Sequence, residues 1–244
     1  MFKSIISAGA VALSLTAQMA FAEDKTILEI AWFKLVPGTE ETQMLEGAQH
    51  VQDKFLPRFD GRIYRELMAE EGGDYWIDSI HWRSVGDFAE AAAEILVDPD
   101  GAPIMELIDI SSMAWFHADR IRHWQTADIP QGDGYTELQV FRLIEPGSEL
   151  EFLYPTTEPE FLTAAEDIQT ELAAQPGFTD RELFRTGDGW WLDLVHWTAK
   201  DAADAAKAAI MADMADMESA TFKFMTKIDP KSVKTFNMNQ KRVW

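Results

Sequence analysis

Residues 75–82 read Tyr-Trp-Ile-Asp-Ser-Ile-His-Trp, and residues 190–197 read Trp-Trp-Leu-Asp-Leu-Val-His-Trp. Trp, Asp, His and Trp recur in one register, so that every matched pair is 115 positions apart. A repeat of this length exceeds the units of about 20–50 residues found in solenoid proteins, and it matches the size of a small domain. The chain is therefore predicted to contain two copies of one structural unit.

Further landmarks extend the repeat along the chain. In the same order in both copies, residues 33–38 match 141–147 with one insertion, 65–67 match 181–183, Ile108-Asp109, Ser112 and Phe116 match Ile228-Asp229, Ser232 and Phe236, and Trp124 matches Trp244. These matches predict two domains of roughly 100 residues each, at 23–124 and 135–244. The polar, glycine-containing stretch 125–134 is predicted to be the linker between them.

The hydrophobic pattern of each copy predicts the order β-α-β-β-α-β, the ferredoxin-like motif. In the first copy we expect strands at 27–35, 62–68, 75–82 and 113–124, helices at 39–59 and 84–96, and a short helical piece at 103–110. In the second copy we expect strands at 135–144, 179–186, 190–197 and 234–244, and helices at 158–175 and 199–217. Met211, Met214 and Met217 recur every three residues, which favours core packing over a copper site.

The N-terminus is typical of a secretory signal peptide. Lys3 gives a positive start, residues 5–15 are apolar, and Ala20-Phe21-Ala22 forms a small-x-small cleavage site. We expect residues 1–22 to be removed after Ala22 and the mature protein to be exported, most simply to a bacterial periplasm. The alternative is an uncleaved anchor, but the apolar run is short for a bilayer core of about 30 Å.

Charge and cysteine content exclude several classes of function. The formal net charge is −21, which argues against nucleic acid and anionic membrane surfaces as partners. The chain has no Cys, so thiol catalysis and thiolate metal sites are excluded. Neither a metal nor a cofactor is predicted from the motifs present.

Both faces of the predicted strand at 75–82 carry apolar residues. Because side chains alternate along a strand, Trp76, Asp78, Ile80 and Trp82 share one face, and Tyr75, Ile77, Ser79 and His81 share the other. A strand that is apolar on both sides is expected to be buried on both sides. Helices can cover one face of the sheet, and the second copy is the obvious cover for the other.

With these motifs the chain resembles the dimeric α+β barrel superfamily, in particular proteins like the antibiotic biosynthesis monooxygenases (ABM-like proteins). The resemblance is carried by residues 73–82, the Ala-rich helix after them and the Ile108-Asp109-x-x-Ser112 element, and in the second copy by residues 189–197, 202–209 and Ile228-Asp229-x-x-Ser232. It implies an α+β fold in which two tandem ferredoxin-like domains form the barrel within one chain. The superfamily includes cofactor-independent oxygenases, haem-handling enzymes and isomerase-like proteins, so the fold does not fix the function.

The candidate catalytic residues are His81 and His196. Each could act as a general base or as an iron or haem ligand. The alternative is a strand histidine that is hydrogen-bonded to a neighbour and holds the scaffold together. A residue that recurs in both copies more often serves the shared scaffold.

Two repeated acidic residues are expected to be structural. Asp78 and Asp193 lie among Trp residues, so each buried carboxylate needs a partner. Arg65 and Arg181, on the preceding strands, are the predicted partners. The functional alternative is a carboxylate with a raised pKa beside an apolar cavity.

Together these features predict an exported protein that binds a small apolar or aromatic molecule in a cavity between sheet and helices, as a monomer with an internal pseudo-dimer. The predicted ligand-binding residues are Tyr75, Trp76, Ser79, Trp82, His117, Trp191 and Trp197. In the oxygenase version, oxygen reacts with an electron-rich substrate and His81 or His196 removes a proton. The alternatives are a non-enzymatic periplasmic binding or stress protein and a haem-interacting protein.

Overall fold

The structure, a computed structural model, describes residues 26–148, 150, 154 and 156–244. The predicted signal peptide at 1–22 lies outside these residues. Within them, no helix has the length and apolar character needed to cross a membrane.

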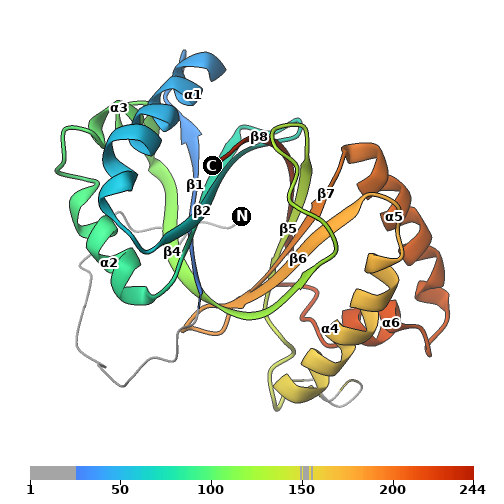
Figure 1. Cartoon of the computed structure of the whole chain (residues 1–244). Helices are drawn as coiled ribbons and strands as arrows, with labels where there is room; N and C mark the ends of the chain where they lie inside the picture. Colours follow the sequence, from blue (N-terminus) through green and yellow to red (C-terminus); the bar gives the residue numbers. More distant parts are fainter. Residues whose placement is uncertain (1–25, 149, 151–153, 155) are drawn as a thin grey trace.

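Eight antiparallel strands close into a barrel (Figure 1). They are β1 (Ile27–Leu35), β2 (Arg62–Glu70), β3 (Tyr75–Trp82), β4 (Ile108–Gln125), β5 (Tyr135–Phe141), β6 (Phe178–Arg185), β7 (Trp191–Trp197) and β8 (Lys234–Val243). Around the barrel the order is β1-β3-β2-β8-β5-β7-β6-β4. Each half of the chain thus supplies four neighbouring strands, and the halves meet where β2 pairs with β8 and where β4 pairs with β6.

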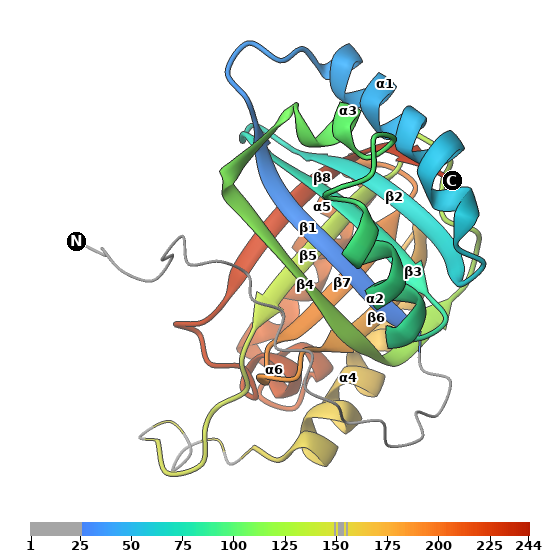
Figure 2. The ribbon, with the colours of Figure 1, turned by 90° about the vertical axis from the view of Figure 1, so that its left-hand side faces the viewer.

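Helices cover the outside of the barrel on two opposite sides (Figures 1 and 2). The first half supplies α1 (Glu41–His50), α2 (Val85–Glu94) and α3 (Ala102–Met105), and the second half supplies α4 (Glu158–Ala173), α5 (Lys200–Ala212) and α6 (Ala220–Met225). The starts of α2 and α4 are fixed by Ser84 and Thr157, whose side chains accept hydrogen bonds from backbone N–H groups of the first turn.

The apolar residues form three layers. One cluster lies between the first-half strands and their helices and includes Trp76, Ile80 and Trp82. An equivalent cluster lies in the second half, and a third fills the barrel interior, where Ile77 lies. The prediction that β3 is covered on both faces is confirmed. The α+β class and the ferredoxin-like strand order are also as predicted, whereas the division into two domains stays a prediction.

In the first half the predicted helix at 39–59 is present but mixed in type, and one predicted strand boundary was wrong. The helix expected at 39–59 consists of α1, a π-helical turn at Val51–Phe55 and a 3₁₀ turn at Leu56–Arg58. Pro57 has no N–H to continue the helical hydrogen bonds, which is consistent with the 3₁₀ turn that ends this segment. The strand expected from 113 begins at Ile108, because Ser112 binds the backbone N–H of Lys34 and holds this segment against β1.

The second half also differs from its predicted pattern. The helix expected at 199–217 ends as α5 at Ala212, and α6 was not foreseen. Core packing of the methionines was a wrong prediction for Met211 and Met217, which are exposed. After α5 ends, the three-residue spacing no longer places these side chains on one helical face.

Candidate functional site

The two repeated histidines lie inside the barrel and are fully buried. His81 Nε2 is 2.8 Å from Glu182 Oε2, and the Tyr64 hydroxyl donates to the same oxygen at 2.9 Å. The Tyr64 ring stacks on the His81 ring with 3.9 Å between centroids. Burial alone would raise the pKa of Glu182, but the charge and hydrogen bond of His81 and the hydrogen bond from Arg120 hold this pKa well below its usual range.

His196, in the second half of the chain, makes the corresponding contact with a Glu of the first half. Its Nε2 is 2.9 Å from Glu66 Oε2, and its Nδ1 is 3.4 Å from Asp180 Oδ1. Burial would lower the pKa of His196, but the two carboxylates raise it to about 10. Each histidine therefore joins its own half of the chain to an acidic residue of the other half.

This arrangement favours the scaffold interpretation of the histidines. Neither side chain lines the two cavities found between sheet and helices. Both imidazoles are held by buried carboxylates, which leaves no ligand-facing nitrogen in those cavities for a proton transfer or a haem iron. Catalysis by His81 or His196 stays a prediction without a geometric basis in these cavities.

The predicted Asp-Arg pairs are present in both halves. Arg65 Nε and Nη2 donate to the two carboxylate oxygens of Asp78 at 2.8 and 2.6 Å, and Nη1 donates to the Ala48 carbonyl at 2.9 Å. Arg181 makes the same two bonds to Asp193, at 2.8 and 2.7 Å, and one to the Ala165 carbonyl at 3.0 Å. Both guanidinium groups are fully buried. These pairs tie each sheet to its first helix.

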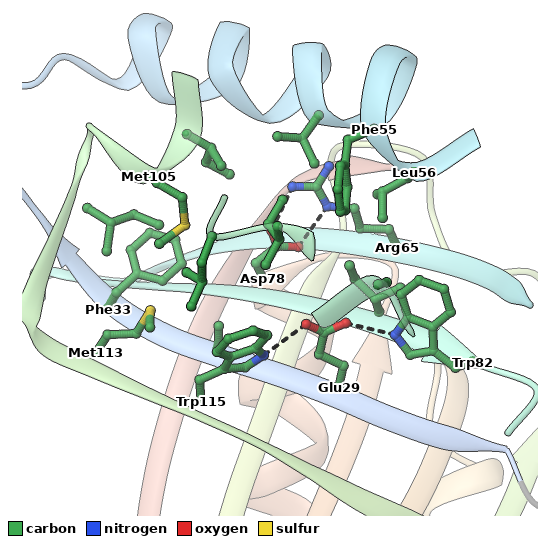
Figure 3. A pocket seen from close by; sticks show the side chains of 18 residues that line it. Glu29, Phe33, Phe55, Leu56, Arg65, Asp78, Trp82, Met105, Met113 and Trp115 are labelled. Carbon is green, nitrogen blue, oxygen red and sulfur yellow. Dashed lines mark hydrogen bonds and ion pairs between the residues drawn. The ribbon is translucent and has the colours of Figure 1, made fainter. Parts of the chain in front are cut away.

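A cavity of about 70 Å³, the first cavity, lies between the first-half strands, the helical turns at 51–58, and α2 and α3. Its wall is mostly apolar and includes Phe33, Phe55, Met105 and Met113, as Figure 3 shows. Leu96, which is 58% exposed, also lines it and marks a side where the cavity approaches solvent.

Glu29 is the central polar group of the first cavity. Its two carboxylate oxygens accept hydrogen bonds from different indoles, Oε2 from Trp82 Nε1 at 2.7 Å and Oε1 from Trp115 Nε1 at 2.8 Å (Figure 3). Burial raises the pKa of Glu29 to about 7, against the opposing effect of the two indole donors. Near neutral pH this carboxyl group can therefore either accept or give a proton.

The second half has an equivalent cavity of about 230 Å³, the second cavity, which lies between β5 to β8 and α4 to α6. Glu137 occupies the position of Glu29, and its Oε2 accepts a hydrogen bond from Trp197 Nε1 at 3.2 Å. Burial also raises the pKa of Glu137.

The predicted ligand-binding residues are spread over several environments. Trp82 lines the first cavity and Trp197 the second. Trp76 and Trp191 are buried in the two outer cores, and Ser79 is buried inside the barrel. The structure does not bring the remaining two, Tyr75 and His117, to either cavity: Tyr75 packs on Phe236 and His117 on Phe88.

Sequence reasoning missed Glu29, Glu137 and Trp115. A signal was present, because a Glu stands in the middle of an apolar strand in both copies at matching positions. A charged residue that recurs on a buried strand needs a partner and marks a candidate site. Trp115 could not be assigned, because its side-chain direction depends on where β4 begins and pairs.

In the described part of the chain, no group of three or more His, Asp or Glu residues is placed to hold a metal ion. No family model matches the sequence, and no curated protein matches it.

Solved structures do resemble the chain. One is a protein of Fusobacterium nucleatum provisionally assigned as a monooxygenase, with a TM-score of 0.64, 10% identity and coverage of 91% of this chain and 95% of that one. A similarly assigned protein of Lactobacillus acidophilus gives a TM-score of 0.60 and 11% identity, covering 90% and 95% of the two chains. An anthrone oxidase-like protein gives 0.62 and 16%, covering 91% and 93%.

These neighbours, together with a ferredoxin-fold protein related to antibiotic biosynthesis monooxygenases, have the fold of ABM-like dimeric α+β barrels. The resemblance inferred from the repeated motifs is confirmed at the level of fold.

Proposed function

We propose that the protein binds a small, largely apolar or aromatic molecule in the first cavity and that Glu29 accepts a hydrogen bond or a proton from it. The observation that carries this proposal is the position of Glu29, a carboxyl group with a pKa of about 7 in a mostly apolar pocket whose other charged groups, Arg65 and Asp78, are paired with each other. Pockets for small molecules combine an apolar wall with a few fixed polar groups in this way.

The two indoles orient the Glu29 carboxylate. Each oxygen accepts one indole N–H, and a carboxylate oxygen has a second lone pair for a further donor. A phenol or enol hydroxyl would satisfy that lone pair, whereas a pure hydrocarbon would leave it unpaired. The preferred ligand is therefore an aromatic molecule with an acidic hydrogen.

The size of the cavity restricts the ligand. A dry cavity of about 150 Å³ holds benzene, and the first cavity measures about 70 Å³. One ring would fit after movement of Met105 and Met113, since unbranched thioether side chains adapt easily. The π-helical turn at Val51–Phe55 borders the cavity and has no counterpart in α4, and such turns are frequent at functional sites.

An oxygenase reaction is the enzymatic form of this proposal. Glu29 would take a proton from an acidic carbon of the substrate, and the resulting electron-rich anion would reduce O₂. The balanced change converts a CH₂ group and O₂ into a carbonyl group and water. It is supported by the fold shared with monooxygenase-like proteins and by Glu29 as the proton acceptor, a role that the sequence had assigned to His81 or His196. A binding protein without turnover would use the same contacts.

A comparison of phenol with benzene tests the hydrogen bond to Glu29, because both rings can fill the cavity but only phenol has a hydroxyl group to donate. Calorimetric titration of the wild-type protein should show tighter binding of phenol. Glu29→Gln should weaken phenol binding about tenfold to hundredfold, because hydrogen bonds to charged groups contribute roughly 1.5–3 kcal/mol, and should leave benzene binding unchanged. Glu94→Gln, at an exposed position of α2 outside both cavities, is the matched control. Equal phenol affinity in all three proteins would refute the proposal, and oxygen consumption with acidic aromatic substrates would distinguish an oxygenase from a binding protein.

We also propose that residues 23–124 and 135–244 are two ferredoxin-like repeats that form one barrel as a monomeric pseudo-dimer, exported after cleavage behind Ala22. Matching contacts in the two halves support the repeats. Either half expressed alone would expose the barrel-facing residues and is expected to dimerise or aggregate, which light scattering would detect. A stable monomeric half would contradict the pseudo-dimer, and an intact N-terminus in the secreted protein would contradict cleavage.

A further inference from the structure

The two cavities correspond position by position, which makes their differences informative. Both are lined by an Arg-Asp pair, by a Trp that donates to a Glu, and by apolar residues of three helices. Val51, Phe55, Met105 and Met113 of the first cavity have as counterparts Ile168, Leu172, Met225 and Val233 of the second.

At three positions an apolar or aromatic residue of the first half has a more polar counterpart in the second half. Trp115 is replaced by Thr235, Ala31 by Gln139, and Ala92, on α2, by Lys207, on α5. All three replacements line the second cavity. Loss of the second indole leaves Glu137 with one indole donor, on Oε2, where Glu29 has two.

The new polar groups make no hydrogen bond or close ion pair with a described residue, although the charge of Lys207 acts on Glu137 and opposes the rise in its pKa. The side chains of Gln139, Thr235 and Lys207 make no hydrogen bond with the described residues, and Lys207 has no ion pair with them within 4.0 Å. Lys207 and Thr235 are exposed, so they lie where the cavity meets solvent, whereas Glu137 and Gln139 are only partly accessible. The cavity therefore offers an acceptor on its strand wall, a cation at its exposed side and an apolar wall between the helices.

We propose that the second cavity is a separate binding site for an aromatic acid that carries a hydrogen-bond donor opposite its carboxylate, such as a hydroxybenzoate. The ring lies against Ile168, Leu172 and Phe224, the hydroxyl group donates to Glu137, and the carboxylate pairs with Lys207. The volume of about 230 Å³ exceeds the roughly 150 Å³ that holds benzene, so one substituted ring fits without rearrangement.

The charges of the two cavities favour an aromatic acid in the second cavity and disfavour it in the first. The Arg181 charge is neutralised by Asp193, so Lys207 is the remaining cation among the lining residues. An aromatic acid in the first cavity would meet Glu29 with no cation left unpaired, since Arg65 is bound to Asp78. This second site does not rest on the function proposed for the first.

The test is calorimetric titration of the full chain with 4-hydroxybenzoate. Lys207→Gln should weaken binding about two- to fivefold, the range expected for an exposed ion pair, and added salt should reduce the wild-type affinity. Lys54→Gln, an equal change of charge at an exposed site in the first half, should have no effect. Because Lys207 is exposed, its replacement leaves the fold intact.

Two further variants locate the ligand. Thr235→Trp restores the residue found at this position in the first half and should abolish binding by filling the cavity. Glu137→Gln should weaken 4-hydroxybenzoate about tenfold and leave 4-methylbenzoate unaffected. The proposal is overturned if the wild-type protein does not bind 4-hydroxybenzoate, or if Lys207→Gln and Thr235→Trp bind it as the wild type does. Sensitivity to Glu29→Gln instead would place the ligand in the first cavity and overturn the second site.

Discussion

Trp244, the last residue of the chain, lies over the guanidinium group of Arg65, with 4.8 Å between Arg65 Cζ and the ring centroid. The backbones of the two residues also exchange hydrogen bonds, of 3.1 and 2.9 Å. Trp124 covers Arg181 in the same manner at 5.0 Å. In each case a Trp at the end of one half of the chain covers the buried Arg-Asp pair of the other half.

Replacement of Trp244 by Ala should therefore destabilise the whole barrel. The loss combines a cation–π contact of roughly 0.5–2 kcal/mol with apolar burial of similar size, so we expect about 2–4 kcal/mol in urea unfolding. Trp244→Phe, which retains a ring over Arg65 but loses the hydrogen bond to Gln49, should lose clearly less. Similar losses in the two variants would show that the ring contact contributes little.

Removal of the acidic residue from a buried ion pair should lower the unfolding free energy more than its removal from an exposed ion pair. Asp193→Ala leaves the fully buried Arg181 charge without its partner, for which we expect roughly 3–5 kcal/mol. Glu158→Ala is the matched control, because its Arg185 pair is about 40% exposed on both sides, and exposed pairs contribute at most about 1 kcal/mol. Chemical denaturation of both variants measures the difference. An unchanged unfolding midpoint in Asp193→Ala would contradict a structural role.

His196 should make the stability of the protein depend on pH in the alkaline range. Because the folded-state pKa of His196 is raised to about 10, from an unfolded value near 6.5, its contribution is fully present below pH 6.5 and is lost as pH rises toward 10. The thermal midpoint of the wild type should fall over this window. His196→Gln, which can still donate to Glu66, should be less stable at pH 7 and should show a flatter profile.

His117→Gln is the control for this experiment. His117 contacts Phe88 and makes no hydrogen bond or ion pair with a described carboxylate. Its variant should keep the slope of the wild type between pH 7 and 10. If His196→Gln kept that slope as well, the His196 to Glu66 contact would not contribute to folding stability.

Local pattern was sufficient to predict the order of strands and helices and the Arg-Asp pairs, whereas the barrel was predicted from the resemblance to ABM-like proteins. Asp78 and Arg65 lie on neighbouring strands of one hairpin, so alternation and burial together identify the pair. The partner of His81 could not be found this way, because Glu182 lies 101 residues away and approaches only when the two halves close the barrel. The first cavity depends on the same kind of long-range geometry, since Trp115 reaches Glu29 only through the pairing of β4 with β1.

Glu29 should also make stability fall as pH rises, but in a lower pH window than His196. Its folded-state pKa of about 7 lies above the ordinary value of 4.5, so between these values the folded protein binds the proton more tightly than the unfolded chain does. Stability from this group is therefore fully present below pH 4.5 and is lost as pH rises to 7, by roughly 2–3 kcal/mol. Glu29→Gln removes this loss, although the Gln amide cannot accept from both indoles and strands one of them.

The measurement is the difference in unfolding free energy between Glu29→Gln and the wild type, taken from pH 4.5 to 8. The unfolding free energy of the variant should rise relative to that of the wild type as pH rises to 7, and the difference should remain constant above that pH. Other acidic groups, such as Glu182 with its lowered pKa, lose stability on acidification in both proteins and cancel in the difference. A difference that does not vary with pH would mean that Glu29 titrates as it would in water, and it would remove the physical basis for a proton-accepting role in the first cavity.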